Sequence, residues 1–286
     1  MKIKNCLKKT ENPSLSFEVF PPKNSSNFES VLSAAEKIAS LEPTFMSVTY
    51  GAGGGTSEYT LSVAYDIQSL GVTAIAHLTC VGATADSIAQ KLASAEKSGI
   101  ENILALRGDL PENYREGEFR HASDLIEFIK SRGDFCVGGA CYPEGHPESQ
   151  NQKLDIENLK LKEAAGCDFM TSQMFFDNNI FYNFMYKVRD AGIKVPIIAG
   201  IMPVTNSKQI ARICKLSGTY LPGKFRQIVD RFGDNPKAMS QAGIAYATEQ
   251  IIDLFANGVN AVHVYSMNNP DVARNIMKNI SEILEK

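Results

Sequence analysis

The chain has 286 residues, of which 44% are hydrophobic and 21% are charged, and its formal net charge is −3. This length and apolar content suit one barrel domain better than two small domains. The slight acidic balance argues against general nucleic-acid binding, which usually needs a basic excess, and no run approaches the roughly 18 consecutive apolar residues of a membrane helix.

Eight apolar runs are predicted to be strands, because most are nearly continuous in hydrophobic character, as parallel strands covered on both faces are. Amphipathic patterns lie between them; Val31, Ala35 and Ile38, for example, recur at three- and four-residue steps. We expect strands at 15–20, 45–50, 73–80, 102–106, 136–142, 169–175, 195–202 and 261–267, and helices at 28–41, 86–98, 123–132, 154–165, 180–191, 206–216 and 236–257.

Strands that alternate with helices predict an α/β fold with a parallel sheet. Eight repeats favour a closed (β/α)₈ TIM barrel over an open doubly wound sheet. Between strands 7 and 8 the sequence predicts an extended insertion of loop and helix, which includes a Gly/Pro-rich stretch at 217–224. Long insertions of this kind often cover a site. We expect residues 1–286 to form a single domain.

The ends of the chain and its cysteines give little sign of export. Residues 1–10 are basic, but no long apolar stretch follows them, so a secretory signal is not expected and the protein is predicted to be cytoplasmic. The six cysteines form neither a Cys-x-x-Cys pair nor a zinc-like cluster with histidine, and we expect reduced core thiols. They are Cys6, Cys80, Cys136, Cys141, Cys167 and Cys214.

Short polar clusters stand at the carboxyl ends of six predicted strands. In a parallel barrel all carboxyl ends meet at one rim, so these clusters predict an active site there. They are Phe17-Glu18-Val19-Phe20-Pro21-Pro22, Thr49-Tyr50-Gly51, His77-Leu78-Thr79, Arg107-Gly108-Asp109-Leu110-Pro111, residues 142–148, and residues 173–177.

Glu18 is a candidate general acid. It lies between Phe17 and Val19 at the end of the first strand, so its carboxyl group is expected to point into the barrel mouth. Apolar surroundings disfavour the charged form and raise the pKa of a carboxyl group, which suits a proton donor. The alternative interpretation is a salt-bridged glutamate of the rim.

Other polar residues of the rim allow several interpretations. Arg107 can bind phosphate or carbonyl oxygens, and Asp109 can accept hydrogen bonds from a heterocycle; the alternative is an internal Arg–Asp pair. His77 and His146 both stand at strand ends, where Glu144 or Glu148 could complete a metal site, but no metal-ligand motif is present and no metal is predicted.

Two further segments are ambiguous on pattern alone. Asp155, Asn158 and Lys162 form one polar stripe of a helix, and a solvated helix face is the simplest interpretation. The glycine-rich run 51–56 lacks the lysine of a P-loop and the spacing of a Rossmann fingerprint. It is either a flexible turn of the rim or a place where backbone amides approach a ligand.

Taken in order, the clusters resemble the methylenetetrahydrofolate reductases of the short bacterial type, which consist of the catalytic barrel alone. The resemblance extends from residue 16 to beyond residue 260. It is carried by residues 16–23 (SFEVFPPK), 46–52 (MSVTYGA), 76–80 (AHLTC), 104–111 (LALRGDLP), 122–125 (ASDL), 140–148 (ACYPEGHPE), 173–177 (QMFFD) and 200–204 (GIMPV).

The resemblance implies a barrel that holds FAD without a covalent bond and reduces 5,10-methylenetetrahydrofolate to 5-methyltetrahydrofolate, the methyl source for methionine synthesis. The electron donor would be NADH or NADPH, with a protein partner as an alternative. Donor and folate would use the same place in turn, which gives ping-pong kinetics. The family also suggests a homo-oligomer.

The resemblance assigns a role to each matching position. Glu18 would protonate N10 of the folate as its five-membered ring opens, and Asp109 would lie near the flavin and the pterin. Gln173 would contact nicotinamide and folate, and Gln209 would contact folate. The positions that match cofactor contacts are Thr49, Tyr50, Ala52, His77, Arg107, Gly108, Asp109, Ala122, Tyr142, His146, Asp155, Asn158 and Lys162, so the resemblance replaces the solvated-face interpretation of the helical stripe.

The sequence departs from the family pattern at two positions. Leu161 stands where a basic residue often lies beside the lysine of the cofactor helix. Asn269 stands where many members have an arginine that helps to bind folate, so the glutamate tail would be held differently, for instance by basic residues of 206–231. The rival predictions are another TIM-barrel enzyme, such as a folate-dependent methyltransferase or a metal-dependent lyase, and a non-catalytic subunit of the same fold.

Overall fold

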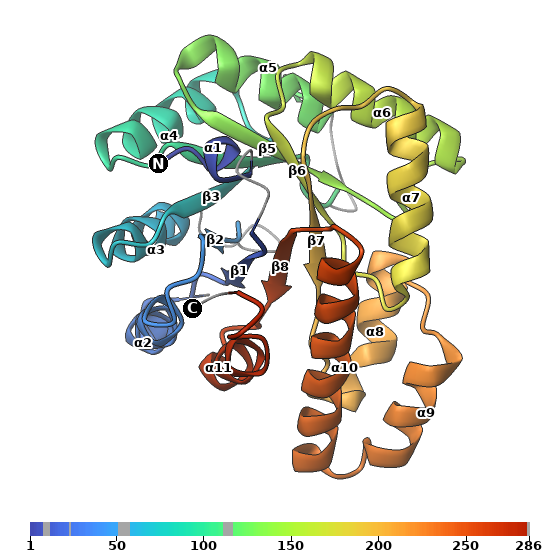
Figure 1. Ribbon diagram of the computed structural model, residues 1–286. Coiled ribbons are helices and arrows are strands. Elements are labelled where there is room, and N and C mark those ends of the chain that lie inside the picture. Colours follow the sequence, from blue (N-terminus) through green and yellow to red (C-terminus); the bar gives the residue numbers. More distant parts are fainter. Residues whose placement is uncertain (8–11, 23, 51–57, 111–116, 285–286) are drawn as a thin grey trace.

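Eight parallel strands close into a barrel in the order β1 to β8, with helices around the outside (Figure 1). The computed structural model describes residues 1–7, 12–22, 24–50, 58–110 and 117–284. The predicted (β/α)₈ class is therefore confirmed. The strands are β1 Ser14–Val19, β2 Met46–Val48, β3 Ala74–Thr79, β4 Asn102–Leu106, β5 Cys136–Cys141, β6 Phe169–Ser172, β7 Ile197–Ile201 and β8 Ala261–Tyr265.

The helices between the strands follow the predicted pattern closely and add several that the sequence analysis missed. Gly99, Gly166, Gly192 and Gly258 each follow a helix with positive φ, as expected for helix C-caps. The helices are α1 Ile3–Leu7, α2 Phe28–Ala39, α3 Glu58–Ser69, α4 Ala85–Lys97, α5 Ala122–Arg132, α6 Gln152–Ala164, α7 Asn178–Asp190, α8 Ser207–Ser217, α9 Gly223–Phe232, α10 Pro236–Ala256 and α11 Pro270–Asn279, with a 3₁₀ turn at Ser25–Asn27.

The insertion between β7 and β8 consists of α8, α9 and α10, as predicted, but it contains one helix more than expected. Residues 217–224 were expected to be loop, yet α9 begins at Gly223 directly after Pro222. Phe225 and Val229 of α9 pack into a small hydrophobic cluster outside the barrel, together with Tyr246 of α10. This apolar spacing of i, i+4 was readable in the sequence but follows a Gly/Pro-rich boundary.

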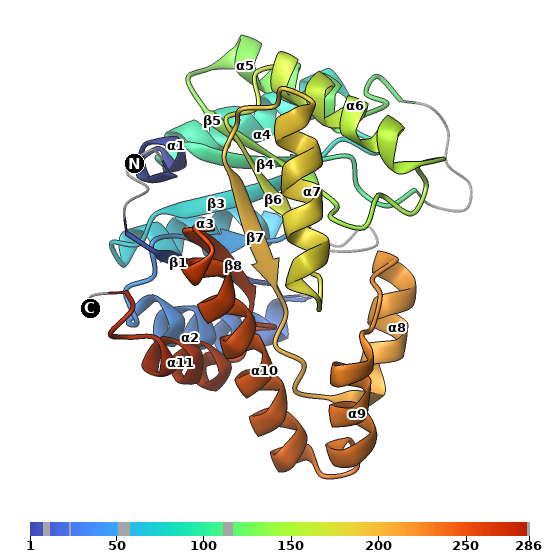
Figure 2. The same ribbon diagram turned by 45° about the vertical axis from the view of Figure 1, so that its right-hand side comes forward.

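The core has one layer inside the barrel and one between barrel and helices. Inside, Phe45, Ile75, Leu104 and Phe169 form a buried cluster with Ile3 of the N-terminal helix. Helix α1 thus covers the amino-terminal end of the barrel, while the α8–α9 insertion lies at the other end (Figure 2). No helix in the described ranges is long and apolar enough to cross a membrane.

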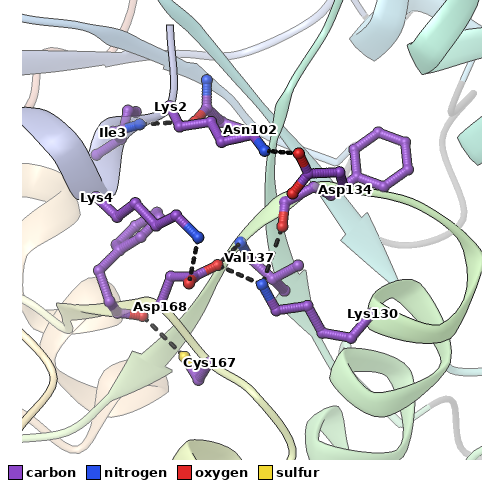
Figure 3. A network of polar contacts seen from close by, with 11 residues as sticks. Lys2, Ile3, Lys4, Asn102, Lys130, Asp134, Val137, Cys167 and Asp168 are labelled. Atoms are coloured by element: carbon purple, nitrogen blue, oxygen red, sulfur yellow. Dashed lines mark hydrogen bonds and ion pairs between the residues drawn. The ribbon is translucent and has the colours of Figure 1, made fainter.

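A polar network fixes α1 to the barrel (Figure 3). The Ile3 amide donates to Asn102 Oδ1 at 2.9 Å. Asp168 accepts from Lys130 Nζ at 2.6 Å, from the Val137 amide at 2.9 Å and from Lys4 Nζ at 3.1 Å. Burial alone would raise the pKa of Asp168, but these hydrogen bonds outweigh it and hold the pKa below its usual value.

We expect Asp168→Asn to lower the free energy of unfolding by about 1–3 kcal/mol at neutral pH, because two ammonium groups lose their carboxylate. Since the folded pKa of Asp168 is depressed, its contribution is present above the pKa of about 3.9 of an unfolded aspartate and is lost as the pH falls through the folded pKa. Urea unfolding at several pH values measures this. A difference from wild type that persists unchanged at the lowest pH would contradict it, and Asp134→Asn, at an exposed partner of Lys2, is the control.

Candidate active site

A cavity of about 480 Å³ opens at the carboxyl ends of the strands. It is called the inner cavity below. Its deepest residues, Phe45, Ile75 and Leu104, belong to the apolar interior of the barrel, and Glu18 and His77 face it from β1 and β3. The predicted rim of strand ends therefore forms one concave site, as the regular spacing of the clusters implied.

Glu18 is buried in the wall of this cavity, with 8% of its surface exposed. Among the described residues no donor lies within hydrogen-bonding distance of its carboxyl group, and the titratable side chain beside it is His77, with Nε2 3.8 Å from Oε2. Removal from water raises the pKa of Glu18 to about 8. At neutral pH the carboxyl group thus holds its proton, which favours the general-acid interpretation over a salt-bridged rim glutamate.

His77 is neutral in the same surroundings. Burial lowers its pKa to about 3, and its Nε2 atom has no hydrogen-bond partner among the described residues. An ion pair would lower the pKa of Glu18 and raise the pKa of His77, which is the reverse of both shifts. The two groups that approach to 3.8 Å are therefore both neutral. His77 lines the inner cavity, and a buried nitrogen without a partner among the described residues is a candidate contact for a ligand.

His263 of β8 lies in the same cavity wall and was not predicted as a site residue. Ser16 Oγ lies 2.8 Å from its Nδ1 and donates to the Val262 carbonyl, so Nδ1 carries the imidazole proton. Ser47 Oγ, 2.9 Å from Nε2, is then the donor to that nitrogen. Both ring nitrogens are satisfied, and burial lowers the pKa of His263 to about 3. A histidine within an apolar strand was the available sequence signal.

A second hollow of about 540 Å³ continues from the inner cavity along the ends of β4 and β5 toward α5 and α6. It is called the outer cleft below. Leu106, Asp109, Tyr142 and Gln173 line both hollows, so the two are continuous. Asp109 is exposed at this junction. Gln173 accepts from the Met174 amide at 2.9 Å through its Oε1, and its NH₂ group has no acceptor among the described residues, so it can donate to a ligand.

Arg107 lies in the outer cleft, paired with Glu148 rather than with Asp109. Its two terminal nitrogens contact the two carboxylate oxygens of Glu148 at 2.6 and 2.8 Å. This contact raises the pKa of Arg107 and lowers that of Glu148. A ligand phosphate in the cleft would meet a guanidinium that is already oriented by a carboxylate.

Tyr142 and His146 form a pair at the same place. Their rings meet edge to face, with centroids 4.6 Å apart. The Glu148 amide donates to His146 Nδ1 at 3.1 Å, so Nε2 carries the proton and can donate into the cleft. Burial lowers the pKa of His146, which keeps the ring neutral, and raises the pKa of Tyr142 to about 12.

The helical stripe of α6 lines the outer cleft and is not a solvated face throughout. Asp155 is buried; its Oδ1 accepts from Ser149 Oγ, and its Oδ2 has no partner among the described residues. Lys162 Nζ donates to the Ala140 carbonyl at 2.7 Å, and burial lowers its pKa. Asn158 is exposed at the edge, and Leu161 adds an apolar side chain that is 59% exposed.

The remaining predicted positions are placed as follows. Thr49 and Tyr50 line the inner cavity, and Gly108 and Ala122 line the outer cleft. Gln209 lies exposed on α8 and lines neither hollow. Ala52 lies outside the described residues.

Asn268 and Asn269 have structural contacts that explain the departure from the family pattern. Asn268 accepts from the Phe20 amide at 2.7 Å and donates to the Phe20 carbonyl at 3.0 Å, which fixes the chain after β1. Asn269 is the N-cap of α11 and accepts from the Asp271 and Val272 amides. Its side chain therefore serves the helix and not the cavity.

The polar groups of the outer cleft are of the kinds that could bind FAD, the cofactor that the resemblance implies. The unpaired Oδ2 of Asp155 can accept from sugar hydroxyls, Arg107 and Lys162 can face phosphates, and His146 Nε2 can donate to an oxygen. In the described part of the chain no group of three or more His, Cys, Asp or Glu residues could hold a metal ion.

Sequence comparisons identify related proteins along nearly the whole chain. A family model described as methylenetetrahydrofolate reductase matches residues 2–281. The 5,10-methylenetetrahydrofolate reductase of Escherichia coli is 35% identical over 91% of this chain and 88% of its own length. The methylenetetrahydrofolate reductase (NADH) 1 of Arabidopsis thaliana is 35% identical over 99% of this chain but 51% of its own length, so the chain spans about half of that plant relative.

Structural comparisons show the same barrel in distant proteins. An uncharacterised protein from Clostridium thermocellum that binds two copies of 5-methyl-5,6,7,8-tetrahydrofolic acid matches with a TM-score of 0.73 at 14% identity, over 99% of both chains. A 2,3-dimethylmalate lyase matches with a TM-score of 0.54 at 12% identity, over 99% of this chain and 86% of the lyase. At these identities the matches show the fold alone.

The burial of Glu18 predicts a pH-dependent stability difference between the protein and Glu18→Gln. Burial raises the pKa of Glu18 in the folded protein to about 8, from 4.5 as the ordinary value. Below pH 4.5 the carboxyl group is neutral in both the folded and the unfolded state, and the folded protein has its full stability. Between pH 4.5 and about 8 the unfolded state loses the proton more readily, so the free energy of unfolding falls. Relative to the glutamine variant, the protein should therefore become less stable across this window and then level off. Urea unfolding without added ligand measures the difference, and a difference that does not change with pH would refute it.

Proposed function

The chain belongs to the methylenetetrahydrofolate reductase family, and we propose that it uses NADH or NADPH and bound FAD to reduce 5,10-methylenetetrahydrofolate to 5-methyltetrahydrofolate. The observation that carries this proposal is a buried carboxyl group, Glu18, in the wall of a cavity that is continuous with a cleft suited to a dinucleotide. Residues 1–286 would act as one flavin-binding catalytic domain.

The cofactor would be held across both hollows. Asp155, Arg107, Lys162 and His146 would bind its sugar and phosphate groups in the outer cleft, and the unpaired nitrogen of His77 would meet it in the inner cavity. When bound, FAD would carry a hydride from the nicotinamide donor to the folate. The protein's share is binding, orientation and the handling of one proton.

Glu18 would supply that proton. Its buried carboxyl group is neutral at neutral pH and has no competing hydrogen-bond partner among the described residues, so its proton is free to move to N10 of the folate as the ring opens. The neutral state of His77 matters here, because a charged imidazolium 3.8 Å away would stabilise the ionised carboxylate and weaken the acid.

Gln173 and Asp109 would receive the substrates. Both stand where the inner cavity meets the outer cleft. The NH₂ group of Gln173 can donate to a carbonyl oxygen, and the exposed carboxylate of Asp109 can accept from N–H groups. The carboxamide of nicotinamide and the ring of the pterin each carry a carbonyl oxygen and N–H groups. Because one such place serves both molecules, they would bind in turn, as ping-pong kinetics require.

The experiment that tests this function separates the two half-reactions. The purified protein should carry a yellow flavin that NADH or NADPH bleaches under anaerobic conditions and methylenetetrahydrofolate restores. Glu18→Gln should keep the first step and slow the second by ~10²-fold or more, within the range of general acids. In the wild type the rate of the second step should fall as the pH rises through about 8, where Glu18 loses its proton. In the Glu18→Gln variant the rate should show no such fall.

Several results would overturn the assignment. A protein without flavin, or with a stoichiometric metal, would favour the methyltransferase or lyase alternatives. A flavin that folate does not reoxidise would refute the reductase function. Equal slowing of both half-reactions in Glu18→Gln would argue against its role as the acid.

Basic residues of the insertion are proposed to hold the anionic glutamate tail of the folate. Residues 206–237 contain seven basic and two acidic residues, although the whole chain has a net charge of −3. Ile213 and Leu216 of α8 line the inner cavity, and the exposed Arg212 lies next to them on the same helix. With Asn269 engaged as a helix cap, Arg212 is the cation placed to meet a tail that leaves the cavity.

We expect Arg212→Glu to raise the KM for a triglutamate form of the substrate about fivefold more than the KM for the monoglutamate form, because charge reversal repels the longer anionic tail. The effect should shrink at high salt. Steady-state kinetics with both substrates measure it. Lys153→Glu, an exposed change on α6, is the control. Equal changes for both substrates would exclude a contact with the tail.

A further inference from the structure

Helix α4 carries a lysine at a position where its amphipathic pattern favours an apolar residue. Ile88, Leu92 and Ala95 are buried on the face of α4 that packs inward. Lys91 lies three residues after Ile88 and four before Ala95, so it belongs to the same face. Turning a charge toward a core is destabilising without a polar partner. A lysine here breaks the local pattern, as residues at functional sites often do.

The partner of Lys91 is the hydroxyl group of Tyr50. Lys91 Nζ lies 2.6 Å from the phenolic oxygen and 5.1 Å from the centroid of the ring. The ammonium group thus stands beyond the hydroxyl edge of the ring and not over its face, which makes the contact a charge-assisted hydrogen bond rather than a cation–π interaction. Among the described residues no carboxylate lies within ion-pair distance of Lys91.

Tyr50 separates two spaces. On one side it lines the inner cavity with Glu18, and on the other it lines a small pocket of about 10 Å³ with Lys91 and Thr60. Thr60 donates to the Thr49 carbonyl at 2.9 Å and so fixes the backbone next to Tyr50. Lys91 therefore approaches Tyr50 from behind, through the wall of the barrel, and does not itself line the inner cavity.

The direction of this hydrogen bond determines whether the Tyr50 hydroxyl group can donate its proton to a ligand. An ammonium group has only donors, so the phenolic oxygen must accept from Lys91, and its own proton points elsewhere. No acceptor for that proton is found among the described residues. Donation from a cation polarises the phenol and makes its O–H a stronger donor. Because Tyr50 also lines the inner cavity, a ligand bound there is a candidate acceptor for this proton.

We propose that Lys91 is a positioning residue of the cofactor site, which holds Tyr50 in the cavity wall and directs its O–H proton toward an oxygen atom of bound FAD. This inference rests on the proposed function, since it takes FAD as the occupant of the inner cavity. Since no carboxylate of the described residues pairs with Lys91, its charge would also place a positive potential beside the cofactor, which favours the more negative redox state of a bound flavin.

The test compares Lys91→Met with the wild-type holoenzyme. Methionine keeps the apolar length of the side chain and removes the donor and the charge. We expect the Kd for FAD, measured from the return of flavin fluorescence on dilution, to rise tenfold or more, as loss of a charge-assisted hydrogen bond implies. The midpoint potential of the bound flavin should become more negative. Lys97→Met, at an exposed position of the same helix, should leave both values unchanged.

A double-mutant cycle separates positioning from a general loss of packing. Tyr50→Phe removes the phenol, and Lys91→Met added to it should raise the Kd for FAD less than twofold further, because the two residues act as a unit. Lys91→Arg should restore part of the affinity. An equal effect of Lys91→Met with and without the phenol, or a wild-type Kd in Lys91→Met, would overturn the proposal while leaving the proposed function intact. A wild-type protein that retains no flavin would refute both.

Discussion

The site depends on keeping the carboxyl group of Glu18 out of water without giving it a hydrogen-bond donor from the described part of the chain. Glu18 is placed by the closure of the barrel, which pairs it with Ser47 on one side and Tyr265 on the other. Below it lie Phe45 and Leu104 of the apolar interior. A lysine or arginine beside it would stabilise the carboxylate and weaken the proposed acid, so that role requires a wall of neutral groups around Glu18.

The same constraint explains the two buried histidines. His77 and His263 are both held neutral by burial, and His263 further satisfies both of its nitrogens through Ser16 and Ser47. Polar groups can thus line the deep part of the cavity without adding charge. The charged groups Arg107, Glu148 and Asp155 lie in the outer cleft instead. In the proposed function, the inner cavity would serve proton transfer and the outer cleft would bind the anionic cofactor.

The features that repeat along the sequence, namely the strands and the polar clusters at their ends, could be predicted. Features that depend on contacts between distant elements could not. Strand ends recur with the period of the fold, so the rim residues could be identified before the structure was known. Helix α9 was missed because Pro222 and Gly223 resembled the middle of a loop, whereas Pro222 is the N-cap residue of α9 and Gly223 is its first helical residue. No pattern in the sequence could show that Lys91 reaches Tyr50, because their contact joins α4 to the end of β2 across 41 residues.

The two departures from the family pattern have different physical consequences. At position 269 the side chain cannot both cap α11 and reach the cavity, because its oxygen accepts from two amides of the first turn. Replacing Asn269 by arginine would introduce a cation but would destabilise the N-terminus of α11 by about 0.5–2 kcal/mol, because the cap would be lost. At position 161 no such conflict exists, since Leu161 is largely exposed at the edge of the outer cleft. The cofactor phosphates would therefore depend on Arg107 and Lys162, and the Glu148 carboxylate that orients Arg107 also draws away part of its charge.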